Sequence, residues 1–173
     1  VARRELFLSL GTGNTITEPT PATYAIVFAA TLTDANGQGV ANVPLSARIL
    51  SARYYKGTRI PAPAPATGWT TDYSIDPGNG NDLIVTYACT DEDLNRNGQL
   101  DSSEDFNNSG RLEAGNIASV SPPGVTDGNG QALITVTYPQ EYAYYLDVEL
   151  SVSSTVQGTE YVRTSKFMLP RSS

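Results

Sequence analysis

Apolar and polar residues alternate along several segments of this chain, which is the pattern of β-strands with one buried face. The longest runs are residues 24–32 and 144–152, in which apolar residues occupy every second position. Shorter runs predict further strands at residues 5–10, 83–89, 131–138 and 161–169, and one that enters through Ala47 and Ile49. No segment of ten or more residues has helical periodicity. We therefore predict an all-β protein.

Turn-forming residues separate these segments, with fifteen Gly and eleven Pro in 173 residues. They gather at residues 11–22, 34–39, 76–80, 126–130 and Gly158, in a proline-rich connector at 61–68, and in an irregular region at 69–82. About seven strands separated by such turns are typical of an immunoglobulin-like two-sheet β-sandwich. The alternation predicts a core made of Leu6, Leu8, Ile26, Phe28, Ala30, Leu32, Leu45, Ala47, Ile134, Val136, Leu146, Val148 and Leu150.

The most distinctive stretch runs from Asp91 to Asn116 and reads DEDLNRNGQLDSSEDFNNSGRLEAGN. It holds seven acidic and two basic residues, a net charge of −5, whereas the whole chain carries −7. Two twelve-residue segments stand end to end in it, at 93–104 and 105–116. The first matches the calcium loop of an EF-hand at every specified position, including Gly at position 6 and Glu at position 12.

The spacing of such a loop follows from the coordination of calcium, which takes six to eight oxygen ligands. Positions 1, 3, 5, 9 and 12 present side-chain oxygens, position 7 presents its carbonyl, and Gly at position 6 allows the sharp turn. The first loop therefore has the predicted Ca²⁺ ligands Asp93, Asn95, Asn97, Gln99 (by its carbonyl), Asp101 and Glu104. The second has Asp105, Asn107, Ser109, Arg111 (by its carbonyl), Glu113 and Asn116.

The last residue distinguishes the two loops. Asn116 cannot supply a bidentate carboxylate, so we expect the second loop to bind calcium more weakly or to rely on Glu113. Leu100 and Leu112 occupy position 8 of their loops, and we expect both to point away from the ion and into the protein.

The alternative interpretation of residues 91–116 is a solvated surface loop whose Asn and Asp side chains bond to nearby backbone. The charge favours calcium, because so much negative charge resists a compact conformation without a cation. Helices are expected on neither side of the loops, and the pair resembles the calcium loops of dockerin and thrombospondin type 3 repeats. That resemblance implies an ion that stabilises a fold, rather than one that opens a helix pair in a sensor.

Composition excludes several kinds of chemistry. The chain has no His and a single Cys, Cys89, so an intrachain disulfide, a Cys/His zinc site and a Ser-His-Asp or Cys-His catalytic group are excluded. We expect Cys89 to be a small buried strand residue. The acidic balance disfavours nucleic acid as a partner, and no apolar run is long enough to insert directly into a membrane. The first ten residues are too short and too polar for a complete signal peptide. This is expected if a leader has been removed or if the sequence is a piece of a longer chain.

Two stretches carry a resemblance to a known family. Residues 32–49 read LTDANGQGVANVPLSARI, and residues 125–139 read VTDGNGQALITVTYP. They resemble the two signature stretches of bacterial Ig-like domains of the invasin and intimin type. The matching residues are Thr33, Asp34, Gly37, Val40, Val43 and Leu45 in the first, and Thr126, Asp127, Gly130 and Ala132 in the second.

The resemblance implies an Ig-like fold and an extracellular or cell-surface location, with the periplasm as an alternative. Such domains run near about 100 residues, so this chain carries about seventy more. We expect one Ig-like domain over residues 1–173, with an insertion at about 51–120 that contains the calcium loops at 91–116. The resemblance says little about what the domain contacts.

Three functions follow as hypotheses. The first is a non-enzymatic calcium-binding module of a bacterial surface or secreted protein, acting as a stalk or adhesion domain, with a protein or glycan of a host or neighbouring cell as candidate partner. The second is a carbohydrate-binding module whose stacking aromatics would be Tyr54, Tyr55, Trp69, Tyr73, Tyr142, Tyr144 and Tyr145, although strand faces favour tyrosine in any case. The third, a hydrolase with paired carboxylates, is disfavoured because metal binding explains the acidic cluster better.

Overall fold

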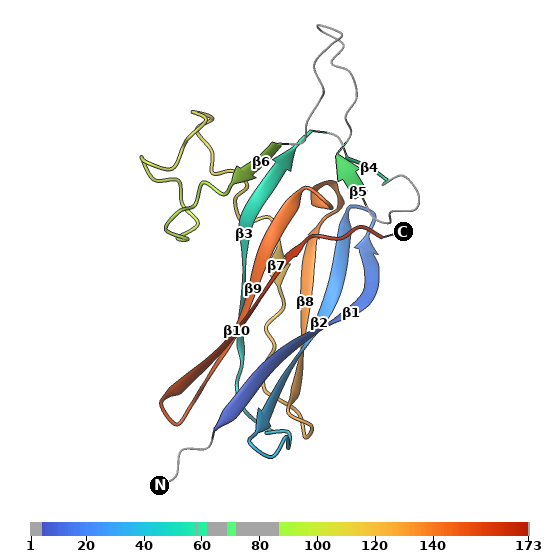
Figure 1. The fold of residues 1–173 in the computed structure, drawn as a ribbon, viewed down its shortest axis with the longest axis vertical. Helices are drawn as coiled ribbons and strands as arrows, with labels where there is room; N and C mark the ends of the chain where they lie inside the picture. Colours follow the sequence, from blue (N-terminus) through green and yellow to red (C-terminus); the bar gives the residue numbers. More distant parts are fainter. Residues whose placement is uncertain (1–4, 58, 62–68, 72–86, 173) are drawn as a thin grey trace, which may run out of the picture.

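The computed structural model describes residues 5–57, 59–61, 69–71 and 87–172, and it consists mainly of two four-stranded antiparallel sheets (Figure 1). The first sheet has the order β1 (Leu6–Thr20), β2 (Thr23–Asp34), β8 (Gln131–Pro139), β7 (Ser119–Val120). The second has the order β10 (Thr159–Met168), β9 (Leu146–Val156), β3 (Ser46–Lys56), β6 (Tyr87–Thr90). Strand β4 (Arg59–Pro61) pairs antiparallel with β5 (Trp69–Thr71) in a separate two-stranded sheet, and a 3-10 turn spans Gln140–Tyr142.

The strand order is that of an immunoglobulin domain. Taken along the chain, the eight sheet strands correspond to A, B, C, C′, D, E, F and G, and they divide into an A-B-E-D sheet and a G-F-C-C′ sheet. The predicted fold class, an all-β immunoglobulin-like two-sheet sandwich, is therefore confirmed.

The core lies between the sheets and follows the predicted alternation. In β9 every second residue from Leu146 to Ser154 is buried, and β8 buries its even-numbered residues from Ala132 to Tyr138. Of the predicted core residues, only Leu8 and Ala47 are partly exposed. The prediction omitted several hydrophobic residues that are buried, namely Tyr24, Ala25, Val43, Ile49, Ala132, Tyr138, Ala143, Val152 and Leu169.

Some expected boundaries are wrong. Residues 11–20 were expected to form turns, yet β1 continues through Thr20. It does so as an edge strand, paired only with β2 and irregular in register between Thr12 and Ile16, and edge strands tolerate Gly, Thr and Pro better than central strands do. Residues 69–71 form β5 within the region expected to be irregular. Most of the predicted proline-rich connector (62–68), most of the predicted irregular region (72–82) and the start of the predicted strand at 83–89 (83–86) lie outside the described residues.

The two stretches with the family resemblance meet at one end of the sandwich, opposite to the acidic loops (Figure 1). The hydroxyl of Thr126 is buried there, where it accepts the Val43 N–H at 3.0 Å and donates to the Val40 carbonyl at 2.7 Å. Gly130 has a φ of +76°, and an added Cβ would overlap backbone atoms of Leu32 and Val40. The turn therefore requires glycine, both for its backbone conformation and for this close approach.

Candidate metal centre

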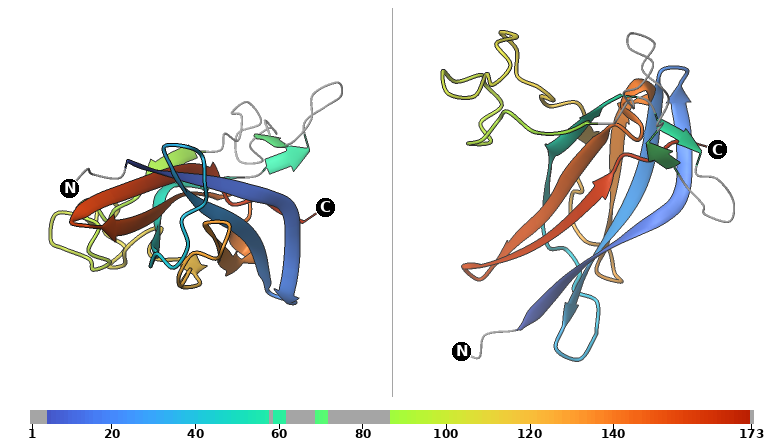
Figure 2. Two further views of the ribbon diagram at one scale, coloured as in Figure 1. Left: turned by 90° about the horizontal axis from the view of Figure 1, so that it is seen from below. Right: turned by 45° about the horizontal axis from the view of Figure 1, so that its top comes forward.

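Residues 91–118 connect β6 to β7, and they project beside the β6 edge of the second sheet in both Figure 1 and the right view of Figure 2. They contain no regular helix or strand of their own. Their shape is determined by hydrogen bonds that main-chain N–H groups donate to side-chain oxygens, which is how short Asp- and Asn-rich segments form stable turns.

The first loop, residues 93–104, curls around its first residue. The carboxylate of Asp93 accepts the N–H groups of Asn97 and Gly98, at 2.9 Å each. The amide oxygen of Asn95 also accepts the Asn97 N–H, at 3.0 Å. Gly98 has a φ of +77°, which provides the turn expected of position 6. The side-chain oxygens of positions 1 and 3 thus both point into the interior of the curled loop.

The second loop, residues 105–116, repeats this geometry residue by residue. Asp105 accepts the N–H groups of Ser109 and Gly110 at 2.8 and 2.9 Å, and Asn107 accepts the Ser109 N–H at 2.8 Å. Gly110 has a φ of +70°. Even position 4 agrees, since Arg96 and Asn108 both adopt positive φ, at 61° and 56°. The repeat predicted from spacing is therefore a structural repeat as well.

Positions 9 and 12 close the first loop. Glu104 is only 2 % exposed, and its two carboxylate oxygens accept the N–H groups of Asn95 at 3.2 Å and Asp101 at 3.1 Å. The Asp101 carboxylate in turn receives the side-chain amides of Asn95 and Asn97, at 2.7 and 2.9 Å. The predicted side-chain ligands of this loop are thus joined in one hydrogen-bonded group.

The second loop closes differently from the prediction. Its position-9 residue, Glu113, receives the side-chain amide of Asn107 at 3.1 Å, as the pattern expects. The side chain of Asn116, however, lies against Gly98 of the first loop. The carboxylate that meets the second loop belongs instead to Glu92, which accepts the Glu113 N–H at 3.0 Å. Pattern matching overlooked Glu92 because it lies outside both twelve-residue segments.

The donor set fits a hard cation. Among the residues that the structure describes, no three acidic or Cys side chains gather closely enough to hold an ion by themselves. Each loop instead combines carboxylates with amide or hydroxyl oxygens and a main-chain carbonyl, which is the mixture that calcium accepts. An ion would exchange the Asn-to-Asp101 hydrogen bonds for oxygen–metal contacts.

The electrostatics also fit a cation. Burial raises the pKa of the Asp91 carboxyl from 3.8 to about 6, and the nearby Asp93 charge contributes to the rise. A charge that is disfavoured in this way is stabilised when a cation is placed beside it.

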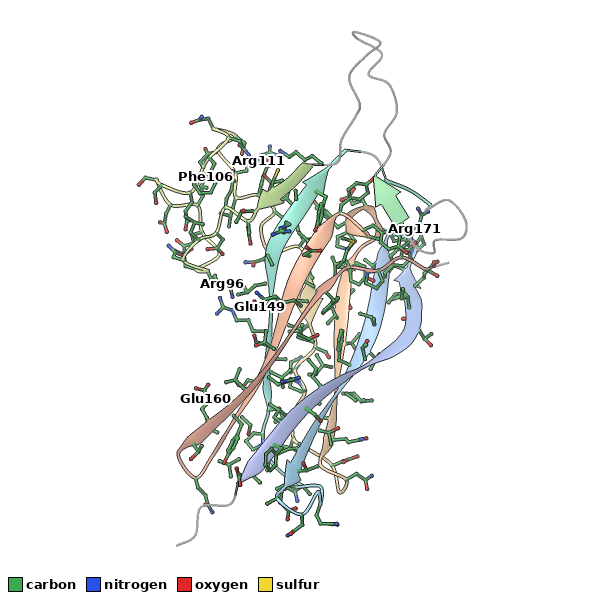
Figure 3. All side chains as sticks on the ribbon, in the orientation of Figure 1. Arg96, Phe106, Arg111, Glu149, Glu160 and Arg171 are labelled. Atoms are coloured by element: carbon green, nitrogen blue, oxygen red, sulfur yellow. The ribbon has the colours of Figure 1, made fainter. Side chains whose placement is uncertain are left out.

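The loops are attached to the sandwich at several points. Arg96 at position 4 forms an ion pair of 2.8 Å with Glu149 of β9, and Figure 3 shows the two side chains side by side. Arg96 and then Lys166 hold the pKa of Glu149 below its ordinary value. The buried Ser51 hydroxyl of β3 donates to the Gly115 carbonyl, and Lys56 pairs with Glu113 at 3.1 Å. The conformation of the loops is therefore coupled to β3 and β9.

Three side chains in or beside this stretch that were expected to be buried are only partly so. Leu100 and Leu112 are both partly buried, as is Cys89 in β6. The position-2 residues Leu94 and Phe106 are exposed, at 58 % and 57 %, and Figure 3 shows Phe106 on the projecting loop.

Four of the tyrosines named as stacking candidates line one cleft beside the loops. It has a volume of about 680 Å³ and is bordered by Tyr54, Tyr55, Lys56, Glu113, Tyr142 and Tyr145. The Lys56 ammonium lies 5.3 Å from the centre of the Tyr54 ring. Each of these tyrosines is partly buried, and Tyr144 is partly buried outside the cleft lining. The side chain of Trp69, and all of Tyr73, lie outside the described residues.

Comparison with known proteins assigns no family. No protein-family model matches the chain, and no curated protein matches its sequence. A solved structure, that of the GAE domain of GGA2p from Saccharomyces cerevisiae, aligns over 99 % of this chain and 100 % of that chain, with 12 % identity and a TM-score of 0.33. Within the described residues, no helix is long and apolar enough to cross a membrane.

Proposed function

We propose that this chain is a non-enzymatic, calcium-binding Ig-like module that uses two adjacent ions to stabilise its loops. The observation that carries the proposal is the repeat itself. Two consecutive segments place Asp at position 1 and Gly at position 6, and in both the position-1 carboxylate accepts the N–H groups of positions 5 and 6. A solvated loop has no need to form the same turn twice at a spacing of twelve residues.

The role of the ions would be structural. The loops are tied to β3 and β9 through Ser51, Lys56 and Glu149, so ordering the loops also stabilises the two central strands of the second sheet. A ligand that binds only the folded protein raises its stability by mass action. The module would therefore be most stable where calcium is abundant.

The proposed setting rests on the same chemistry. Extracellular modules bind calcium with Kd values as weak as about 10⁻⁴–10⁻³ M, and such sites fill only outside the cytoplasm. We therefore place the module in a bacterial cell-surface or secreted protein, as a stalk or adhesion unit. The stretches that resemble invasin- and intimin-type domains support this, because that resemblance implies an extracellular setting. Their two turns meet in the fold through the buried Thr126.

Calcium titration by isothermal calorimetry tests the proposal. We expect the protein to bind two ions and Glu104→Ala to bind one, because this change removes both oxygens that close the first loop. Glu160→Ala is the matched control: Glu160 is an exposed acid on β10, away from the loops in Figure 3, and its removal should change nothing. Absence of bound calcium in the unmutated protein at millimolar concentration would overturn the proposal.

The tyrosine-lined cleft supports carbohydrate binding as a second candidate. Partly buried tyrosine rings beside Lys56 and Glu113 offer both stacking surfaces and hydrogen-bonding groups. Affinity electrophoresis through gels that contain neutral polysaccharides should then retard the protein. Tyr142→Ala should abolish the retardation, while Tyr161→Ala on β10 should preserve it. Unretarded migration would remove this candidate and leave the calcium proposal unchanged.

A further inference from the structure

Glu92 has a buried carboxylate of which only one oxygen accepts a hydrogen bond. The residue is 1 % exposed, which makes it one of the most buried charged residues described. Its Oε2 accepts the N–H of Glu113 at 3.0 Å, but its buried Oε1 has no hydrogen-bond partner. Burying an ionised oxygen without a partner is expensive, so such an oxygen points to a cation or another ligand.

The partner of Oε2 identifies where the carboxylate acts. Glu113 is position 9 of the second loop, and in the first loop the equivalent N–H, that of Asp101, donates to Oε2 of Glu104 at 3.1 Å. Glu104 is the residue of position 12, whose carboxylate closes the calcium shell. Glu92 therefore has the same relation to the second loop as Glu104 has to the first, because each carboxylate accepts the N–H of the position-9 residue.

The backbone holds Glu92 in this place. The N–H of Glu92 donates to the carbonyl of Glu113 at 2.8 Å, so the two residues are joined by both main chain and side chain. The nominal position-12 residue, Asn116, has its amide against Gly98 instead. The second loop thus has a carboxylate at its closing position, although its own twelve residues do not supply one.

We propose that Glu92 is the bidentate carboxylate ligand of a calcium ion in the second loop. The residue that immediately precedes the first loop would then close the second one, so the two sites share one continuous segment, Glu92–Asp93. This inference rests on the proposed function, since it requires that the second loop binds calcium. It replaces Asn116 by Glu92 in the ligand set and restores the charge that the second loop lacked.

The test follows each loop separately by NMR during a calcium titration. The N–H groups of Gly98 and Gly110 donate to the first aspartate of their own loops, so each amide resonance reports one site. We expect both resonances to shift in the unmutated protein. In Glu92→Gln the Gly110 response should need more than about tenfold more calcium, because the charge and the bidentate contact are lost. The Gly98 response should keep its calcium dependence and thereby show that the variant is folded.

Two further variants define the outcomes. Glu92→Asp keeps the charge but shortens the side chain, and it should weaken the Gly110 response as well, whereas Asn116→Ala should leave that response within about twofold. If Glu92→Gln and Glu92→Asp leave the Gly110 titration unchanged, this inference is overturned while the proposed function stands. If neither glycine responds to calcium in the unmutated protein, the proposed function fails, and the inference fails with it.

Discussion

Phe28→Ala is expected to lower the free energy of unfolding by about 3–5 kcal/mol, the usual effect of truncating a buried phenylalanine. Phe28 is 3 % exposed in β2, and its ring lies 5.0 Å from that of Phe167 across the sandwich. Truncation removes the transfer free energy of the ring and leaves a cavity that the rigid strands fill only in part. Urea unfolding followed by circular dichroism measures the change.

The matched control for this prediction is Leu133→Ala. Leu133 lies on the neighbouring strand β8 but is 63 % exposed, so its truncation should change the unfolding free energy by less than about 0.5 kcal/mol. A loss below about 1 kcal/mol for Phe28→Ala would mean that the face of β2 identified as buried does not carry the core.

Removing calcium with EDTA is expected to lower the melting temperature. At a calcium concentration a hundredfold above Kd, one bound ion adds about 2.7 kcal/mol to the stability of the folded state. Because the loops contact the sandwich mainly through β3 and β9, hydrogen exchange should accelerate first in residues 91–116 and much less in β2 and β8.

Two variants identify the origin of that effect. Glu104→Ala should lose the part of the calcium-dependent rise in melting temperature that comes from the first loop, because its closing carboxylate is gone, and should keep the part that comes from the second loop. Asn116→Ala should retain most of the calcium dependence, since its side chain lies beside Gly98 rather than at the second loop. Identical melting of the unmutated protein in calcium and in EDTA would show that the acidic stretch is a solvated insertion.

The parts of the fold that could be predicted from sequence are those with a strong local pattern. Strand β8, strand β9 up to Ser154 and strand β2 from Ile26 to Leu32 alternate between buried and more exposed residues, and their buried faces follow from this directly. The second half of β1 has no such pattern, because an edge strand with an irregular register needs less burial and accepts Gly and Thr. Its pairing with β2 is a property of the sheet that the segment alone does not reveal.

The candidate site also has a part that could be predicted from the sequence and a part that could not. The positions within each twelve-residue loop were predictable, because a curled loop brings alternate residues to one point. Glu92 was not predictable from the pattern, since it meets the second loop through Glu113, which lies 21 residues further along the chain. The relevant signal in the sequence was a second acidic residue directly before Asp93, combined with a loop that lacks its own closing carboxylate.

The order of strands in the two sheets also bears on how the molecule avoids joining to copies of itself. A sandwich has open edges, and each invites another chain to add a strand. Here the four outer strands are β1, β7, β10 and β6. β1 is irregular in register, β7 has two residues and β6 has four, while β10 carries the exposed charges Glu160, Arg163 and Lys166. Short, irregular or charged edges discourage lateral pairing. The consequence is that lateral polymerisation of neighbouring copies is disfavoured at each of these edges.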